Sequence, residues 1–350
     1  MQKIPVVIIL VLVLVSSACQ AQQPTLVLPL GKGKVAILLD SSDASKAIVY
    51  DRRNGFFDKI TAGEMSIQMK KNLDPTLSRD TLLREYVQFL GKDVTSFGAG
   101  EVKFMTGVLE KMFKTVQSIG GDIFPDTLLL IKTKGRHYGD GVWYTRENCI
   151  VIPANELTSS KTNPFTTTMY HELFHIYSRL NPDKSEKLYQ LIGFEAIGYN
   201  NLDVPTGLAQ RILFNPDGVD FAQKISLAQQ DTTIKYAVPI IYSNHVGYKT
   251  GNNEFFGYLK FNLFQIEKEP SGRWRVLVQE DGYSSTLSMD TQLDFFRQIK
   301  DNTGYIIHPD EVLADNFAFI MQELNGAKVS LQFSPAGKQL LLDIKKIIQQ

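Results

Sequence analysis

Residues 171–175, His-Glu-Leu-Phe-His, are the segment of this chain best suited to catalysis. The sequence has five histidines, and two of them lie here, four positions apart. On a helix, residues i and i+4 share one face, so both imidazoles can reach a single zinc ion at about 2.0–2.1 Å. Glu172 projects about 100° around the helix, where it can act on water instead of binding the metal. This spacing predicts His171 and His175 as zinc ligands and Glu172 as the catalytic base.

The residues around the motif predict a helix. Asn163 and Pro164 form an N-cap followed by proline at the first helical position. Apolar residues then recur at helical spacing up to Leu180, and the pair 181–182, Asn-Pro, ends the run. An ordinary amphipathic helix with two solvated histidines is the alternative, but the specificity of the motif favours a metal site.

Catalytic zinc has three protein ligands, so a third ligand is expected outside the motif. The candidates that the sequence offers are Glu195, His245, His308 and Glu311. We favour Glu311, because Pro309 predicts the start of a helix on which Glu311 and Asp315 face the same way. One carboxylate can then bind the metal while the other orients a ligand histidine. An acidic first turn favoured by the helix dipole is the alternative, and Glu195 is the main rival ligand.

The pattern His171-Glu172-x-x-His175 followed by Glu311-x-x-Ala314-Asp315 resembles the gluzincin group of zinc metallopeptidases. The resemblance implies one zinc ion held by the two histidines and Glu311, with Glu172 as general base and Asp315 bracing a ligand histidine. It covers the two motif helices and not the whole chain. The stretch between His175 and Glu311 is far longer than in the thermolysin-like members of the group, which leaves the third ligand open. No narrower family is indicated.

The N-terminus predicts export. A basic start at Met1–Lys3 precedes an unbroken apolar run at Val6–Val15, which is too short to cross a membrane as a helix. We therefore expect a signal peptide over residues 1–21. Ser17-Ala18-Cys19 resembles a bacterial lipobox, which would lipidate Cys19; ordinary cleavage after Ala21 is the alternative. Either way the mature protein is expected outside the cytoplasm, as a lipoprotein of the periplasm or cell envelope or as a secreted protein.

Composition excludes some functions. Lys plus Arg and Asp plus Glu number 37 each, without a basic cluster, so nucleic-acid binding is not indicated. We expect membrane contact only through a lipid at Cys19. After processing, Cys149 would be the one remaining cysteine, which rules out an intramolecular disulfide. Its place in an apolar hairpin predicts a buried structural thiol.

The order of apolar patterns predicts an α+β fold, with an antiparallel β-rich insertion between the motif helix and the third-ligand helix. The order of helix, strands and motif helix resembles a zincin fold, which implies a zincin-like catalytic domain. In the first half we expect strands at 34–39, 47–50, 64–69 and 128–131, helices at 82–90 and 102–119, and a hairpin over 142–152. The expected sections are a signal peptide (1–21), a β-containing segment (22–95), the part with the motif helix (96–200), the β-rich insertion (201–290) and a helical part carrying the third ligand (291–350).

Three β-like runs at 236–242, 257–266 and 274–278 predict an antiparallel meander that forms a wall or lid over the zinc. Pro239 predicts that the first of them is an edge strand. The strand at 142–144 or 150–152 is a candidate to pair with an extended peptide substrate, and an ordinary sheet strand is the equally favoured alternative.

These features together predict a zinc metallopeptidase that acts on a peptide or protein. In this scheme zinc lowers the pKa of its bound water towards about 7, and Glu172 takes the proton. His245, Tyr242 and Tyr248 are candidates to stabilise the oxyanion, although an incidental loop histidine is the simpler interpretation. His137 is expected on the surface. The alternatives are a zinc hydrolase of a non-peptide substrate and a non-catalytic binding lipoprotein that keeps a zinc site.

Overall fold

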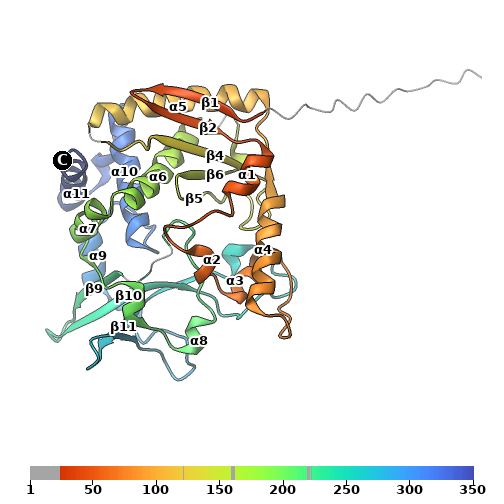
Figure 1. Ribbon diagram of the computed structural model, residues 1–350. Helices are drawn as coiled ribbons and strands as arrows, with labels where there is room; N and C mark the ends of the chain where they lie inside the picture. The colour runs from red at the N-terminus through yellow and green to blue at the C-terminus, as the bar shows by residue number, and fades with distance from the viewer. Residues whose placement is uncertain (1–23, 121, 159–161, 219–220, 222) are drawn as a thin grey trace, which may run out of the picture.

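The computed structural model describes residues 24–350 except positions 121, 159–161, 219–220 and 222. The expected signal peptide and Cys19 lie outside the described residues. The fold is α+β, as predicted, and its described strands form two six-stranded sheets (Figure 1). No helix among the described residues has the length and apolar character needed to cross a membrane.

The first sheet supports the motif helix. Its order is β1 (Leu26–Gly31), β2 (Lys34–Leu38), β4 (Thr127–Thr133), β6 (Cys149–Pro153) and β5 (Tyr144–Arg146), and the short β3 (Val94–Thr95) pairs with β4. The three central strands β2, β4 and β6 are parallel, whereas β1 and β5 are antiparallel edge strands. The predicted strands at 34–39 and 128–131 and the hairpin over 142–152 are therefore confirmed.

Both faces of the first sheet are covered, because alternate residues of a strand point to opposite faces. Leu128, Leu130 and Ile150 pack in one core with the long helices α5 (Ala99–Ile119) and α6 (Thr162–Leu180). Ile131 and Val151 pack in a second core with the N-terminal helices and the second sheet. The motif helix thus lies on one face of this sheet.

The N-terminal segment is more helical than expected. It forms α1 (Ser41–Ala47), α2 (Phe56–Lys59), α3 (Ala62–Met69) and α4 (Arg79–Asp93). The predicted strands at 47–50 and 64–69 are wrong. The second is helix α3, whose N-cap Thr61 accepts a hydrogen bond from the backbone N–H of Glu64 at 2.9 Å. A short apolar run does not by itself distinguish a buried helix from a strand. Here the N-cap at Thr61 stabilises the helix.

Helix α10 (Pro309–Leu324) runs against α6, and both lie beside the first sheet in Figure 1. The predicted start at Pro309 and the stop at Asn325–Gly326 are confirmed, as is the end of α6 at Leu180. The other helices around this pair are α7 (Pro182–Leu191), α9 (Leu293–Ile299) and α11 (Pro335–Ile348).

The second sheet has the order β7 (Phe194–Ala196), β9 (Gln223–Ala228), β10 (Ile234–Tyr242), β11 (Lys260–Lys268), β12 (Trp274–Val276) and β8 (Leu202–Asp203). Strands β10 to β12 form the predicted antiparallel meander. Two strands that were not predicted, β9 and β7, extend the sheet beyond β10, and β7 lies before residue 201.

The prediction that Pro239 marks an edge strand is wrong, since β10 lies between β9 and β11. The carbonyl of Ile241 accepts a hydrogen bond from Leu213 N, which lies on the side of β10 opposite β11. The backbone N–H and C=O groups of the odd-numbered residues of β10 therefore point away from β11. On that side β9 pairs only as far as Ala237. Pro239 lies beyond the last residue of β10 that pairs with β9, so its missing N–H removes no hydrogen bond between these strands.

Candidate metal centre

Two helices bring the predicted ligands together. α6 presents His171 and His175, with ring centroids 4.8 Å apart, and the first turn of α10 presents Glu311. Glu311 Oε2 lies 3.0 Å from His171 Nε2 and 3.3 Å from His175 Nε2. Ligand atoms about 2.0–2.1 Å from a tetrahedral zinc are about 3.3–3.4 Å apart, so these separations fit a shared ion.

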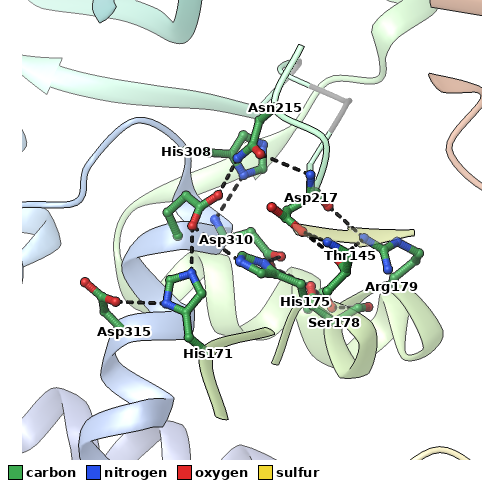
Figure 2. Close-up of polar contacts among 12 residues, drawn as sticks. Thr145, His171, His175, Ser178, Arg179, Asn215, Asp217, His308, Asp310 and Asp315 are labelled. Carbon is green, nitrogen blue, oxygen red and sulfur yellow. Dashed lines mark hydrogen bonds and ion pairs between the residues drawn. The ribbon is translucent and has the colours of Figure 1, made fainter. Parts of the chain in front are cut away.

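Each histidine is oriented by a different carboxylate of α10. His171 Nδ1 lies 2.9 Å from Asp315 Oδ1, and His175 Nδ1 lies 2.7 Å from Asp310 Oδ2 (Figure 2). Each carboxylate accepts a hydrogen bond from the Nδ1–H group of its histidine. In a neutral ring the free lone pair is then on Nε2. Both lone pairs then face the Glu311 oxygen. Acceptors gathered in this way need a cation between them, either protons or a metal.

The burial of these atoms supports a metal as the cation. His175 Nε2 is buried and has no hydrogen-bond partner among the described residues. A buried polar atom without a partner is costly, and binding a metal would remove that cost. Two imidazole nitrogens and one carboxylate oxygen are also a donor set that catalytic zinc uses. The residues present therefore fit a zinc ion.

The bracing carboxylates are themselves held. Asp310 Oδ1 accepts hydrogen bonds from Ser178 Oγ at 2.6 Å and Tyr189 Oη at 2.8 Å. Asp315 accepts a bond from the Thr303 hydroxyl. Such outer contacts fix the ring orientation that the ligands need before an ion arrives.

The second oxygen of Glu311 is also occupied. Asn215 Nδ2 donates to Glu311 Oε1, and Asn215 Oδ1 accepts a bond from Asp217 N at 3.0 Å (Figure 2). One oxygen is thereby held by an amide, and only Oε2 faces the two histidines. The turn that carries Asn215 belongs to the long stretch between the motif helices, which therefore contributes directly to the site.

Electrostatics in the cluster favour positive charge. Burial opposes ionisation of Glu311, but His175 and His171 outweigh it and hold the pKa of Glu311 well below its usual range. Burial by itself lowers the pKa of His171. The hydrogen bonds that its ring donates to Asp315 and Glu311 more than reverse this and raise the pKa of His171 to about 10. A cation placed among these groups is stabilised by the same carboxylates.

Glu172 lies on the same helix but outside the ligand trio. It is buried, and its Oε2 has no hydrogen-bond partner among the described residues. Burial, reinforced by the nearby charge of Asp217, raises the pKa of Glu172 to about 8. Such a carboxylate is a stronger base than a solvated one. It lines a cleft of about 380 Å³ together with His171, Asp217 and Tyr305.

The rival ligands lie elsewhere. Glu195 is exposed on strand β7, not on a helix, and forms an ion pair with Lys224. His245 is exposed in the loop after β10. His308 is the N-cap of α10, where its Nδ1 accepts a bond from Asp310 N at 3.1 Å. The geometry thus gathers Glu311 with the histidines and leaves out the other three candidates.

Other residues singled out in the sequence do not line the cleft. The oxyanion candidates Tyr242, Tyr248 and His245 do not line the cleft. His137 is not a surface residue: it is buried, with Nδ1 2.5 Å from Asp93 and Nε2 3.0 Å from the hydroxyl of Tyr144. Its partners compensate for burial, which the isolated sequence does not reveal. Cys149 is buried, as predicted.

Four residues at the site were missed from the sequence: Asp310, Asn215, Asp217 and Tyr305. Asp310 adjoins the favoured ligand in sequence but points about 100° away from it on α10, so helical spacing does not indicate its role. Asn215 and Asp217 lie in the sequence Asn-Pro-Asp-Gly, which predicts a turn and nothing more. Tyr305 lies in the loop before α10, with its ring stacked on His171 at a centroid distance of 6.0 Å.

The edge of the first sheet at the cleft is partly closed. β6 is an interior strand, so only β5 could accept a substrate strand. The outward N–H and the hydroxyl of Thr145 on β5 both donate to Asp217 Oδ1 (Figure 2). Strand addition at Thr145 would therefore require Asp217 to move.

The chain matches no known family model, and no curated protein or solved structure is significantly similar to it. The resemblance to gluzincins thus rests on the motif residues and their geometry alone, and binding of zinc stays a prediction.

Proposed function

We propose that the protein is a zinc-dependent metallopeptidase with a zincin-like, gluzincin-type centre. One observation carries the proposal. His171, His175 and Glu311 converge from two helices with their donor atoms directed at one point, beside the unpartnered carboxylate of Glu172. We place the enzyme outside the cytoplasm because of the expected signal peptide, with Cys19 as its lipid anchor.

Zinc bound by the trio would supply a Lewis acid that polarises the scissile carbonyl and activates water. Glu172 accepts a proton from the attacking water and delivers it to the leaving nitrogen. Burial in the cleft suits this role, because it raises the pKa of Glu172 to about 8 and so strengthens the base. Asp310 and Asp315 hold the two imidazoles in the tautomer that presents Nε2 to the ion.

Tyr305 is the residue that we assign to oxyanion stabilisation. It lines the cleft beside His171, and its ring is stacked on that of His171. A tyrosine hydroxyl is protonated at neutral pH and can donate a hydrogen bond to the negative charge that develops in the transition state. Peptides are preferred over other substrates only through the gluzincin resemblance, so a non-peptide hydrolase is the second candidate.

The test separates zinc binding from turnover. Glu172→Gln should retain one zinc per chain, because Glu172 is not a ligand, but should lose cleavage of a peptide library by about 10²–10⁴-fold. His171→Ala should lose both zinc and cleavage. Glu110→Gln, an exposed substitution on α5, is the control that should change neither. Wild-type protein without zinc, or Glu172→Gln with undiminished cleavage, would refute the proposal; zinc without cleavage of any peptide would favour the non-peptide hydrolase.

A further inference from the structure

A small second cavity opens beside the cleft. The two cavities share Val142, Trp143, Phe256, Tyr305 and Asp217 along their common border. Beyond that border the smaller one is lined mainly by apolar side chains. Most belong to the β-rich part (Leu213, Phe214, Ile241, Phe255 and Leu259), and Ile307 comes from the loop before α10. A substrate group that enters the cleft next to Glu172 can therefore extend into an apolar side pocket.

The border of this side pocket is aromatic and partly exposed. Phe256, next to the pocket in the short helix η4 (Phe255–Gly257), is 57% exposed, and Tyr305 is 40% exposed. Large apolar side chains left in water at the mouth of a cleft mark a place where an apolar ligand gains most from binding.

The polar side chains of the side pocket are largely engaged by other residues. Asn215 is engaged by Glu311 and Asp217, and Asp217 is engaged by Thr145. The hydroxyl of Tyr138 is buried and has no hydrogen-bond partner among the described residues. It is the one feature that could favour a hydroxyl-bearing side chain over a hydrocarbon, so the test must compare the two.

The size of the side pocket limits what it can hold. Its volume of about 50 Å³ has room for about three to five groups the size of a water molecule, which need ~10–15 Å³ each. Valine, leucine and isoleucine side chains have three or four non-hydrogen atoms. Alanine leaves most of the space empty, and phenylalanine or tryptophan exceeds it.

We propose that the side pocket selects substrates with a branched aliphatic residue, valine, leucine or isoleucine, directly beside the scissile bond. This inference rests on the proposed peptidase function. The β-rich part of the chain would then determine specificity as well as hold Glu311 through Asn215. In apolar pockets, one methylene changes kcat/KM by about 10–200-fold. We therefore expect leucine to exceed alanine by at least about 10-fold.

The first experiment measures kcat/KM of the zinc-loaded protein on a peptide series that varies only the two residues flanking the cleaved bond. Leucine, isoleucine, valine, threonine, alanine and phenylalanine are compared. Leu259 is half-buried and lines the pocket, so Leu259→Phe should fill it and erase the leucine preference. Leu259→Ala should enlarge it and raise cleavage next to phenylalanine. Ile234, exposed on the same sheet and away from both cavities, provides the matched controls Ile234→Phe and Ile234→Ala, which should change neither preference.

The second experiment measures binding without turnover. The chain has two tryptophans, and Trp143 borders the pocket while Trp274 lies in β12. In a Trp274→Phe background, N-acetyl-leucinamide should perturb Trp143 fluorescence at a concentration at least about 10-fold lower than N-acetyl-alaninamide. Leu259→Phe should abolish that difference, and Ile234→Phe should not.

The outcomes separate the two proposals. Peptide cleavage without an aliphatic preference, threonine favoured over valine, or a preference unaffected by Leu259→Phe would overturn the side-pocket assignment and leave the peptidase intact. If no peptide is cleaved, the peptidase proposal fails and the amide titration decides alone: equal response to the leucine and alanine amides overturns the side-pocket assignment, and a selective response that Leu259→Phe removes supports it.

Discussion

The substitution Asp310→Asn tests whether the braces on the histidines matter for zinc binding. Asp310 is buried, with 5% of its side chain exposed, and accepts bonds from His175, Ser178 and Tyr189. Asparagine must turn its NH₂ either to His175 or to the two hydroxyls. In the first case the imidazole is forced to protonate Nε2, which removes the lone pair that faces Glu311. In the second case both hydroxyls must reverse, and the negative charge beside the ring is still lost.

The expected size of this effect follows from burial. Loss of an outer partner of a metal ligand costs about 10–100-fold in affinity. We expect Asp310→Asn to lower the zinc affinity by about 100-fold, which corresponds to about 2.7 kcal/mol. The loss is at the upper limit of the range because water cannot easily replace a buried carboxylate. Asp315→Asn should cost nearer 10-fold, since Asp315 is 26% exposed and water can reach His171 Nδ1 in its place.

Zinc affinity would be measured by competition with a fluorescent chelator. Asp343→Asn, at a half-buried position on α11 that does not line the cleft, serves as the control. Thermal unfolding of each zinc-free variant checks that it is folded. If a folded Asp310→Asn protein binds zinc like the wild type, or if Asp315→Asn costs more, then the tautomer argument is refuted.

Two further predictions concern the third ligand and pH. Glu311→Ala should lose zinc and activity, whereas Glu195→Ala should keep both, and the opposite result in elemental analysis would show that the third ligand is wrong. Burial raises the pKa of Glu64 from 4.5 to about 8, so the folded protein retains a proton that the unfolded chain has lost. This contribution is complete below pH 4.5 and is lost as the pH rises through 8, so the free energy of unfolding should fall by up to roughly 4–5 kcal/mol. Glu64→Gln should flatten the profile in urea titrations from pH 5 to 9. Glu85→Gln, at a half-buried position on α4 with 40% of its side chain exposed, should not. A wild-type profile without this fall would contradict the assignment.

Elements with a strong local signal could be predicted from the sequence. The helices α5, α6 and α10 and the meander have apolar periodicity over many residues, and α10 also has clear start and stop residues. Shorter elements failed: α3 has eight residues, too few for a helical period to be distinguished from an apolar strand. Pro239 failed for another reason, because its tolerance depends on where a neighbouring strand ends.

The residues of the site likewise divide into those that local sequence spacing indicates and those that only the folded structure brings together. The histidines and Glu172 follow from spacing within one helix, and Asp315 follows from spacing to Glu311. Asp310 is next to Glu311 and therefore points about 100° away on α10, and only the approach of α6 brings it to His175. No spacing rule relates residues on different helices.

Asn215 explains why the long stretch between the motif helices is compatible with one metal centre. Glu311 and His171 are 140 residues apart in sequence, a separation that left the third ligand open. If the intervening residues were an independent module, nothing in them would need to contact the ligands. Instead Asn215 binds the second oxygen of Glu311, and Asp217 from the same turn reaches Thr145 at the edge of the first sheet. The second sheet also packs against that sheet through the core containing Val238, Ile240 and Val151. The β-rich stretch is therefore part of the structure that holds Glu311 beside the two histidines.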